Sequence, residues 1–313
     1  MSEEQESHPK RPGRRGLMTA ALAGVGGAAL GLVGGAALAA APKAPVIEIR
    51  DRQRFRDKVV LITGATSGIG AAAARMFAAE GAKVGFCGRR EARGRAVESE
   101  IAAKGGTARY IRADIRIEDD VRKFVDQVGD LFGGLDVCFN NAGITIEKPL
   151  HEYSLAEWDD VVNTDLRGVF LALKYEIPHL MARGGGVVVV TSSSNAIATT
   201  ERRSAYSAAK RGLVGLVQAA AQDYAAHNIR INALIPGTTD TELVRRAGGM
   251  LDVPDPVWEA AASVWAKSHV PVARRMARPE EIAAFALALA SDEFAYMNGA
   301  QMVVDGGKTA HSG

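Results

Sequence analysis

Short apolar runs alternate with amphipathic or charged stretches along most of this chain. Strands are predicted at 58–63, 82–87, 109–113, 135–139, 187–190, 229–235 and 301–304, and helices between them at 71–80, 91–104, 118–132, 154–181, from 206 onward and at 279–290. The run at 187–190 is four valines, which is typical of a strand buried on both faces of a parallel sheet. This alternation predicts right-handed crossovers and an α/β fold, a doubly wound parallel sheet of about seven strands.

Local signals refine two segments of this pattern. Ser154 and Glu157 form a capping box at the start of the helix predicted at 154–181. Pro178 is expected to kink or shorten the last turn of that helix. Residues 238–275 are predicted to form a long irregular or helical insertion, and residues 57–313 a single domain.

The first 56 residues differ from the rest of the chain. A polar head that carries Arg14 and Arg15 precedes a stretch without charge at 17–42. We therefore assign 1–42 to a signal or membrane-anchor segment and 43–56 to a linker. The arginine pair before a glycine-diluted apolar stretch resembles a twin-arginine signal, which predicts cleavage near 39–41 and export to the periplasm in the folded state. The alternative is an uncleaved anchor, because 17–41 is long enough to span a bilayer of about 30 Å.

Composition narrows the possible partners. The net charge is +2 and the arginines occur as scattered short pairs, a pattern that does not indicate a nucleic-acid partner. Cys87 and Cys138 both fall inside predicted strands, and two cysteines do not make a disulfide framework. The six histidines show no ligand spacing, so no metal is assigned.

Tyr206 and Lys210 are the first candidates for chemistry. Four residues apart at the start of a helix, they share one helix face. A phenol titrates near pH 10, and a neighbouring cation lowers that by roughly 1 to 3 units. The pair is therefore suited to act as a base toward an alcohol or an acid toward a carbonyl near neutral pH. Ser193, at the end of the valine strand, would hydrogen bond the reacting oxygen.

Gly64, Gly68 and Gly70 lie between the first predicted strand and the helix that follows. Glycine permits a tight turn there and lets a pyrophosphate approach the N–H groups of the helix N-terminus. The spacing is GxxxGxG and does not match the GxGxxG fingerprint. A turn that serves packing alone has the same local pattern.

Together these motifs resemble the single-domain branch of the short-chain dehydrogenase/reductase superfamily. The resemblance covers residues 57–308 and rests on TGATSGIG at 63–70, NNAG at 140–143, Ser193 with YSAAK at 206–210, PGTTDT at 236–241, RPEEIA at 278–283 and VVDGG at 303–307. It implies a Rossmann-like fold and NAD(P)-dependent hydride transfer between a secondary alcohol and a ketone. It also implies a homo-oligomer, a dimer or tetramer.

The resemblance assigns roles to individual residues. Tyr206 would exchange a proton with the substrate oxygen, Lys210 would support the tyrosine and bind the nicotinamide ribose, and Ser193 would orient the oxygen. Asn140 would line the cofactor floor together with NNAG residues that follow it. The implied cofactor-binding set is Gly64, Thr66, Ser67, Gly68, Ile69, Gly70, Arg89, Asp114, Ile115, Asn141, Ala142, Gly143, Tyr206, Lys210, Pro236, Gly237, Thr239 and Thr241.

One position departs from the family pattern. The family usually has asparagine three residues before the glycine of the long helix, and here that residue is Asp165 before Gly168. Asn163 is two residues early and should point elsewhere on the helix. In the family the main-chain carbonyl at this position holds a water that extends the proton path from the lysine. A carbonyl survives the change, so Asp165 is kept in the catalytic set; a degraded proton relay is the alternative.

The residue type after the second strand favours NADP. An acidic residue there would bind the adenosine ribose hydroxyls, but the chain has Gly88, Arg89 and Arg90. Guanidinium suits a 2′-phosphate, so Arg89 is predicted to bind it. NAD is the alternative, with Arg89 stacked on the adenine.

Two other functions share these features. One is reduction of a ketone in a thioester-linked 3-oxoacyl substrate, and the other is a nucleotide-binding scaffold or sensor with little turnover. The insertion carries the apolar residues Leu243, Met250, Leu251, Val257, Trp258 and Trp265. These residues favour a small apolar or ring-shaped substrate, unless they only pack the insertion against the core.

Overall fold

The computed structural model describes residues 53–310. The signal or anchor segment predicted at 1–42, with Arg14 and Arg15, lies outside the described residues, as does the linker up to residue 52. No helix within 53–310 combines the length and the apolar character that crossing a bilayer requires.

Seven parallel strands form one sheet in the order β3-β2-β1-β4-β5-β6-β7. They are β1 (Val59–Thr63), β2 (Lys83–Gly88), β3 (Thr107–Arg112), β4 (Val137–Asn140), β5 (Gly186–Thr191), β6 (Ile229–Pro236) and β7 (Gln301–Val304). The predicted fold class is confirmed. Strand order reverses between β1 and β4, and in open parallel sheets the ligand crevice is expected at the carboxyl ends of the two strands at such a reversal.

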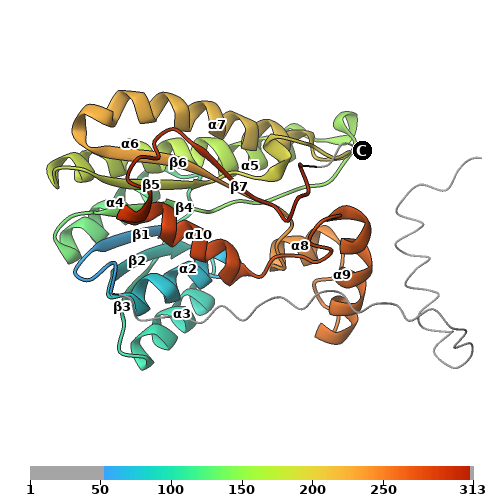
Figure 1. Ribbon diagram of the computed structural model, residues 1–313, viewed down its shortest axis with the longest axis horizontal. Helices are drawn as coiled ribbons and strands as arrows, with labels where there is room; N and C mark the ends of the chain where they lie inside the picture. The colour runs from blue at the N-terminus through green and yellow to red at the C-terminus, as the bar shows by residue number, and fades with distance from the viewer. Residues whose placement is uncertain (1–52, 311–313) are drawn as a thin grey trace, which may run out of the picture. The chain divides into compact units, whose positions relative to one another are not determined.

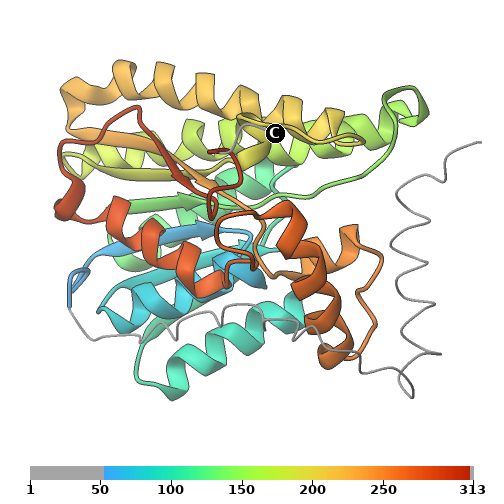
Figure 2. The same ribbon diagram turned by 45° about the vertical axis from the view of Figure 1, so that its right-hand side comes forward.

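Helices cover both faces of the sheet (Figures 1 and 2). One face carries α2 (Gly68–Ala79), α3 (Glu91–Ala103) and α10 (Pro279–Ala290), and the other carries α4 (Glu118–Phe132), α6 (Gly168–Ala182) and α7 (Ser204–Tyr224). Alternate residues of β1 enter the two cores: Val60 and Ile62 on the first face, Val59 and Leu61 on the second. Both faces of the central strand are therefore dry, as an all-parallel sheet requires.

The helix predicted at 154–181 is continuous but changes geometry along its length. It begins as α5 (Leu155–Val162), passes through a π-helical segment, η2 (Asn163–Arg167), and continues as α6. The capping box is confirmed, since Ser154 Oγ accepts the Glu157 N–H at 3.2 Å and the Glu157 carboxylate accepts the Ser154 N–H at 3.0 Å.

Pro178 was expected to kink or shorten the last turn of this helix, and the shortening is not observed. Pro178 lies inside α6, which runs on to Ala182. Ile177 and Leu180, on either side of the proline, are buried against the sheet, and this packing holds the turn in spite of the missing N–H.

The insertion at 238–275 is helical. It contains α8 (Glu242–Ala247) and α9 (Asp255–His269), which lie side by side (Figures 1 and 2). Met250 and Trp258 are buried, and the Trp258 indole N–H donates to Asp240 Oδ1 at 2.8 Å. Single-turn helices occupy η1 (Leu150–Glu152), η3 (Ser194–Ala196), η4 (Ala225–His227) and η5 (Asp292–Phe294).

Candidate active site

The glycine turn joins β1 to α2 at the crevice between β1 and β4. Gly64 has φ +71°, and a Cβ there would stand 2.6 Å from Ala142 Cα, so only glycine lets the two loops approach. Ser67 precedes the first turn of α2 and makes no side-chain capping bond. The N–H groups that open α2 are thus left for an anion, as a bound pyrophosphate requires.

Thr63 holds the NNAG loop against this turn, a role that the sequence analysis missed. Its hydroxyl oxygen accepts the backbone N–H groups of Asn141 at 3.0 Å and Ala142 at 3.2 Å. Asn140, predicted to line the cofactor floor, turns away from it: its amide donates to Glu176 Oε2 at 2.8 Å, and both side chains are buried. A hydroxyl at the end of a strand was the one available signal for Thr63.

The PGTTDT turn closes over the start of α2. A Cβ on Gly68 would stand 3.2 Å from Thr241 Cγ2, and Gly68 has φ +55°. Thr241 also caps α8 by accepting the Val244 N–H at 3.4 Å. Thr239 is buried and donates to the carbonyl of Gly237 at 3.2 Å. The structure therefore brings the first and the last of the predicted cofactor-binding turns together.

Tyr206 and Lys210 lie together on the first turns of α7. The Lys210 ammonium is 5.6 Å from the centroid of the Tyr206 ring and donates to the Thr191 carbonyl at 3.0 Å. Lys210 is buried, whereas Tyr206 is half-buried. Ser193 Oγ accepts the Asn195 N–H at 3.2 Å, which leaves its own hydroxyl hydrogen for a substrate oxygen.

Asp165 contacts Lys210 directly. Its Oδ2 lies 3.2 Å from Lys210 Nζ, and its Oδ1 accepts the Ile144 N–H at 2.8 Å. The side chain has no exposed surface. The sequence pointed to the main-chain carbonyl of Asp165 but not to this side-chain contact, because the contact joins two helices that are distant in the chain.

This ion pair sets the charge of Lys210. Burial by itself lowers the pKa of the Lys210 ammonium, but the nearby Asp165 carboxylate outweighs it and the pKa is raised. Burial also raises the pKa of Asp165, against the opposing effect of Lys210 and the Ile144 N–H. Lys210 is therefore a cation throughout the neutral range.

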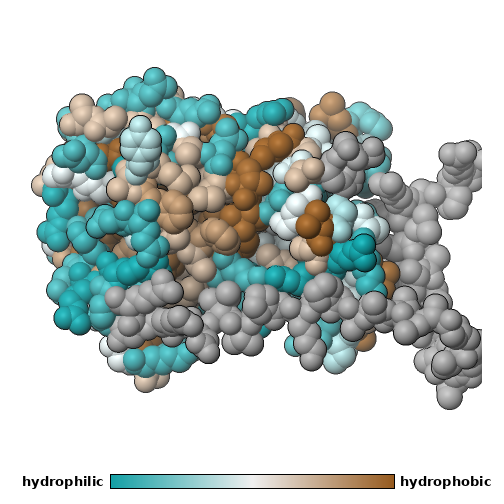
Figure 3. Space-filling view, in the orientation of Figure 1, coloured by the Kyte–Doolittle hydropathy of each residue, from teal (hydrophilic) through white to brown (hydrophobic). Residues whose placement is uncertain are grey.

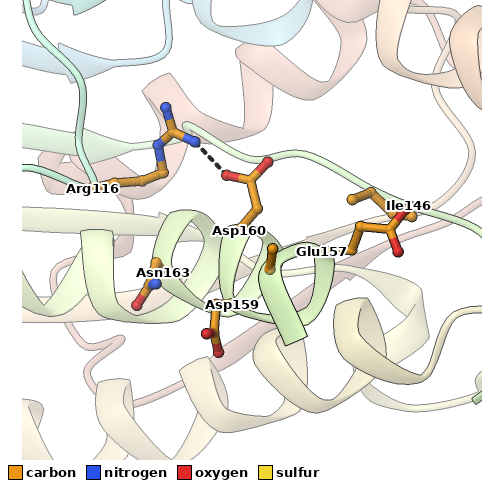
Figure 4. A pocket seen from close by; sticks show the side chains of 7 residues that line it. Arg116, Ile146, Glu157, Asp159, Asp160 and Asn163 are labelled. Atoms are coloured by element: carbon orange, nitrogen blue, oxygen red, sulfur yellow. Dashed lines mark hydrogen bonds and ion pairs between the residues drawn. The ribbon is translucent and has the colours of Figure 1, made fainter. Parts of the chain in front are cut away.

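Asn163 points elsewhere, as predicted. It lines a surface cavity of about 400 Å³ together with Arg116, Asp159 and Asp160 (Figure 4). In the same view Arg116 pairs with Asp160.

The two arginines that follow β2 have different surroundings. Arg89 is exposed, whereas the neighbouring Arg90 reaches the glycine turn and donates to Ser67 Oγ at 2.6 Å and Thr66 Oγ1 at 3.1 Å. Arg90 also donates to Glu242 of α8 at 2.5 Å, and Arg93 pairs with the same carboxylate. Arg90 and Glu242 were both missed; the arginine pair after β2 was the only signal.

Asp114 and Ile115 are already engaged within the protein. Arg116 Nε donates to Asp114 Oδ1 at 2.9 Å, and these bonds outweigh burial, so the pKa of Asp114 is lowered. Ile115 is buried, and a Cβ on Gly168 would stand 2.7 Å from its Cδ1. Its side chain therefore packs against α6.

Comparison with known proteins agrees with this geometry. A family model described as Enoyl-(Acyl carrier protein) reductase matches residues 64–309. The cis-4-hydroxycyclohexanecarboxylate dehydrogenase of Sinomonas cyclohexanicum is 41% identical over 82% of this chain and 99% of its own length. The cyclohexanol dehydrogenase of Acinetobacter sp. (strain SE19) is 37% identical over 82% of this chain and 97% of its own. The crystal structure of levodione reductase has a TM-score of 0.76 and 36% identity, and covers 82% of this chain and 100% of its own.

The chain belongs to the short-chain dehydrogenase/reductase superfamily. It is an NAD(P)-dependent oxidoreductase that interconverts secondary alcohols and ketones. The bound nicotinamide supplies or accepts the hydride. In this dehydrogenase/reductase the Lys210 ammonium places a positive charge 5.6 Å from the centre of the Tyr206 ring, beside the phenol that is expected to exchange a proton with the substrate.

Proposed function

We propose that this enzyme interconverts a carbocyclic secondary alcohol and its ketone, with NADP as the cofactor. The observation that supports a ring-shaped substrate is the apolar insertion, whose start at Thr241 meets the glycine turn beside the cofactor site. Leu243, Leu251 and Trp265 of this insertion are half-buried, which leaves apolar surface for a ligand. Two of the relatives are named for cyclohexane-ring substrates, in line with this class.

Part of the insertion serves packing instead. Trp258 and Met250 are buried within it, and the Arg245 guanidinium lies 5.2 Å from the centre of a Trp258 ring. These two apolar residues hold the insertion together, and Val257 is exposed. The apolar residues of the insertion that we propose to contact the substrate are therefore Leu243, Leu251 and Trp265.

The support for NADP is the Arg90 guanidinium at the glycine turn. Arg90 donates to Ser67 and Thr66, so a donor with two fixed N–H directions stands at the rim of the pyrophosphate site. Gly88 stands where an acidic residue would repel a 2′-phosphate, and a Cβ there would stand 2.6 Å from Thr66 Cγ2. We assign the 2′-phosphate to Arg90, with the exposed Arg89 in a secondary role.

An apolar surface supports a homo-oligomer. Apolar side chains gather over β7 and α10 in Figure 3, and there Val303 of the edge strand and Phe285 are 42% and 39% exposed. An edge strand with exposed apolar side chains is a surface that a second copy of the chain would cover.

For the leader we propose export through the twin-arginine route, followed by cleavage near 39–41. A nicotinamide enzyme loads its cofactor where that cofactor is made, so folding before transport suits it. An uncleaved anchor at 17–41 is the competing proposal.

The substrate proposal is tested with the purified full-length protein. Cyclohexanol, 4-hydroxycyclohexanecarboxylate, linear secondary alcohols and a 3-oxoacyl thioester are offered with NADP(H) and with NAD(H), and the change in nicotinamide absorbance is followed. The expected result is the highest kcat/KM for ring substrates with NADP(H). Preference for the 3-oxoacyl thioester would favour acyl reduction, and absence of turnover on all of these substrates would favour a scaffold.

A further inference from the structure

The buried pair of Asp165 and Lys210 adds a negative charge to the catalytic centre. The Asp165 carboxylate comes from the π-helical segment η2 and meets the ammonium of α7 at 3.2 Å. The two residues are 0% and 2% exposed. A Cβ added at Gly143 would stand 3.1 Å from Asp165 Oδ2 and 3.3 Å from Lys210 Nζ, so the NNAG loop packs directly against both charged groups.

The geometry indicates that Asp165 is ionised. Its Oδ2 lies 3.2 Å from the Lys210 ammonium as an ion pair without a hydrogen bond, and its Oδ1 accepts the Ile144 N–H at 2.8 Å. The lysine in turn donates to the Thr191 carbonyl at 3.0 Å. Burial raises the pKa of Asp165, whereas the adjacent ammonium and the Ile144 N–H favour the charged form of its carboxylate.

A neutral side chain and a carboxylate at position 165 have different effects on the protonation of the Tyr206 phenol. A lone ammonium beside a phenol favours the phenolate, by roughly 1 to 3 pH units for close pairs. A carboxylate in contact with that ammonium cancels most of its net charge, so the phenol experiences a small dipole instead of a full cation. Burial strengthens this cancellation, because little water is present to screen either charge.

We propose that Asp165 is a positioning residue which, through Lys210, keeps Tyr206 in its protonated form and so biases this enzyme toward ketone reduction at neutral pH. In reduction the carbonyl carbon receives a hydride from the reduced nicotinamide and the carbonyl oxygen receives the Tyr206 proton. The ketone becomes an alcohol and the cofactor is oxidised. Alcohol oxidation needs the phenolate, and therefore begins at a more alkaline pH than it would beside an unpaired lysine.

Few other charged groups face this pair within the described residues. The charged or titratable groups that act on Lys210 are Asp165 of η2 and Tyr206 of its own helix α7. The cation that acts on Asp165 is Lys210. The negative charge of Asp160 in α5 raises the pKa of Asp165, as burial does, but Asp160 forms an ion pair with Arg116 at the surface. From β5 and the NNAG loop the pair receives backbone groups, the Thr191 carbonyl and the Ile144 N–H.

The test is a direct titration of Tyr206 in the cofactor-free protein. Tyrosinate absorbance is followed against pH, and the spectrum of the Tyr206→Phe variant is subtracted at each pH, so the difference reports Tyr206. The comparison is between the wild type, Asp165→Asn and Asp159→Asn. The last variant makes the same charge change at an exposed residue of the preceding helix α5.

The expected result is a Tyr206 transition at lower pH in Asp165→Asn than in the wild type, by roughly one unit or more, and no change in Asp159→Asn. The rise of alcohol oxidation with pH, measured as kcat/KM, should move in the same direction. Coincident transitions in the wild type and Asp165→Asn would overturn the proposal. So would a Tyr206 transition below about pH 8 in the wild type, a result that does not depend on any Asp165 variant.

This inference rests on alcohol–ketone interconversion and not on the proposed ring substrate. Cyclohexanol and cyclohexanone are the first pair used for the pH profiles, and failure to turn them over would count against the substrate class alone. The tyrosinate titration is independent of substrate and cofactor, so its outcome still decides the role of Asp165.

Discussion

The Arg90 guanidinium donates to the Glu242 carboxylate at 2.5 Å and thereby ties the end of β2 to the insertion helix α8. The same guanidinium reaches Ser67 at the start of α2, so one side chain joins the end of β2, the glycine turn and the insertion. Burial raises the pKa of Glu242, but its bonds to Arg90 and Arg93 outweigh this and the pKa is lowered. Glu242 is therefore an anion at the place where a 2′-phosphate would compete for Arg90.

Removal of the Arg90 side chain should weaken NADP binding more than NAD binding. A charge-assisted hydrogen bond contributes about 1.5–3 kcal/mol, so Arg90→Ala should lower the affinity for NADPH by roughly 10- to 150-fold. Arg89→Ala is the matched comparison, with the smaller effect because Arg89 is exposed. Fluorescence titration with NADPH and NADH measures both. A larger loss of NADPH affinity in Arg89→Ala than in Arg90→Ala would show that Arg89 binds the 2′-phosphate. Equal losses of affinity for NADPH and NADH would show that Arg90 does not bind the phosphate.

Neutralisation of Glu242 should have the opposite effect. Glu242→Gln keeps the shape of the side chain but releases Arg90 and Arg93 from a carboxylate, so NADPH should bind several-fold more tightly while NADH changes little. Asp255→Asn is the control, because Asp255 is a carboxylate on the neighbouring helix α9 that pairs with Arg245 at 2.6 Å. Weaker NADPH binding in Glu242→Gln would show that the carboxylate supports the site instead of competing for it.

Loss of the Tyr206 hydroxyl should abolish turnover and leave binding intact. Tyr206→Phe keeps the ring beside Lys210 but removes the proton that the substrate oxygen needs, and general acid–base catalysis of this kind contributes typically about 10²–10⁴-fold. The measurements are kcat and the NADPH dissociation constant, which should stay within a few-fold of the wild type. Retention of most of the rate would disprove the assigned chemistry.

Glu176 should make the stability of the protein depend on pH. Burial raises its pKa from 4.5 to about 8, so between these values the native state holds a proton that the unfolded state has lost. The free energy of unfolding should then fall as the pH rises through this window, by up to about 1.4 kcal/mol per pH unit. Glu176→Gln should flatten this slope in urea unfolding, while Glu259→Gln, at an exposed residue of α9, should keep it. Parallel slopes in all three proteins would contradict the buried, protonated state of Glu176.

The leader proposal has its own test in cell fractionation. Replacement of both Arg14 and Arg15 with lysine keeps the charge but removes the arginine pair, so periplasmic protein should disappear if export uses the twin-arginine route. N-terminal sequencing of the exported wild type should find a start near 39–41. Periplasmic protein that persists in the lysine variant would reject the route, and a start at Met1 would favour the anchor.

Local patterns in the sequence were sufficient for the fold and for much of the site. The predicted bounds of α4, α10 and β7 coincide with the observed ones, because amphipathic period, capping residues and terminal glycines are local signals. The alternation of strands and helices implied a parallel sheet, since a helical crossover leaves few other topologies. The pairing of Tyr206 with Lys210 also followed from spacing alone, as residues four apart on a helix lie on one face.

Tertiary structure alone decided how the charged groups are paired. Asp165 meets Lys210 because η2 and α7 pack side by side and the π-helical turn directs the carboxylate inward, and neither fact is encoded in the spacing of the two residues. The contact of Arg90 with Ser67 of the glycine turn also depends on long-range packing, and so does the hydrogen bond from the Asn140 amide to the buried carboxyl group of Glu176 in α6. Sequence determines which groups are available, whereas long-range packing determines which of them share a buried site and so change each other's charge.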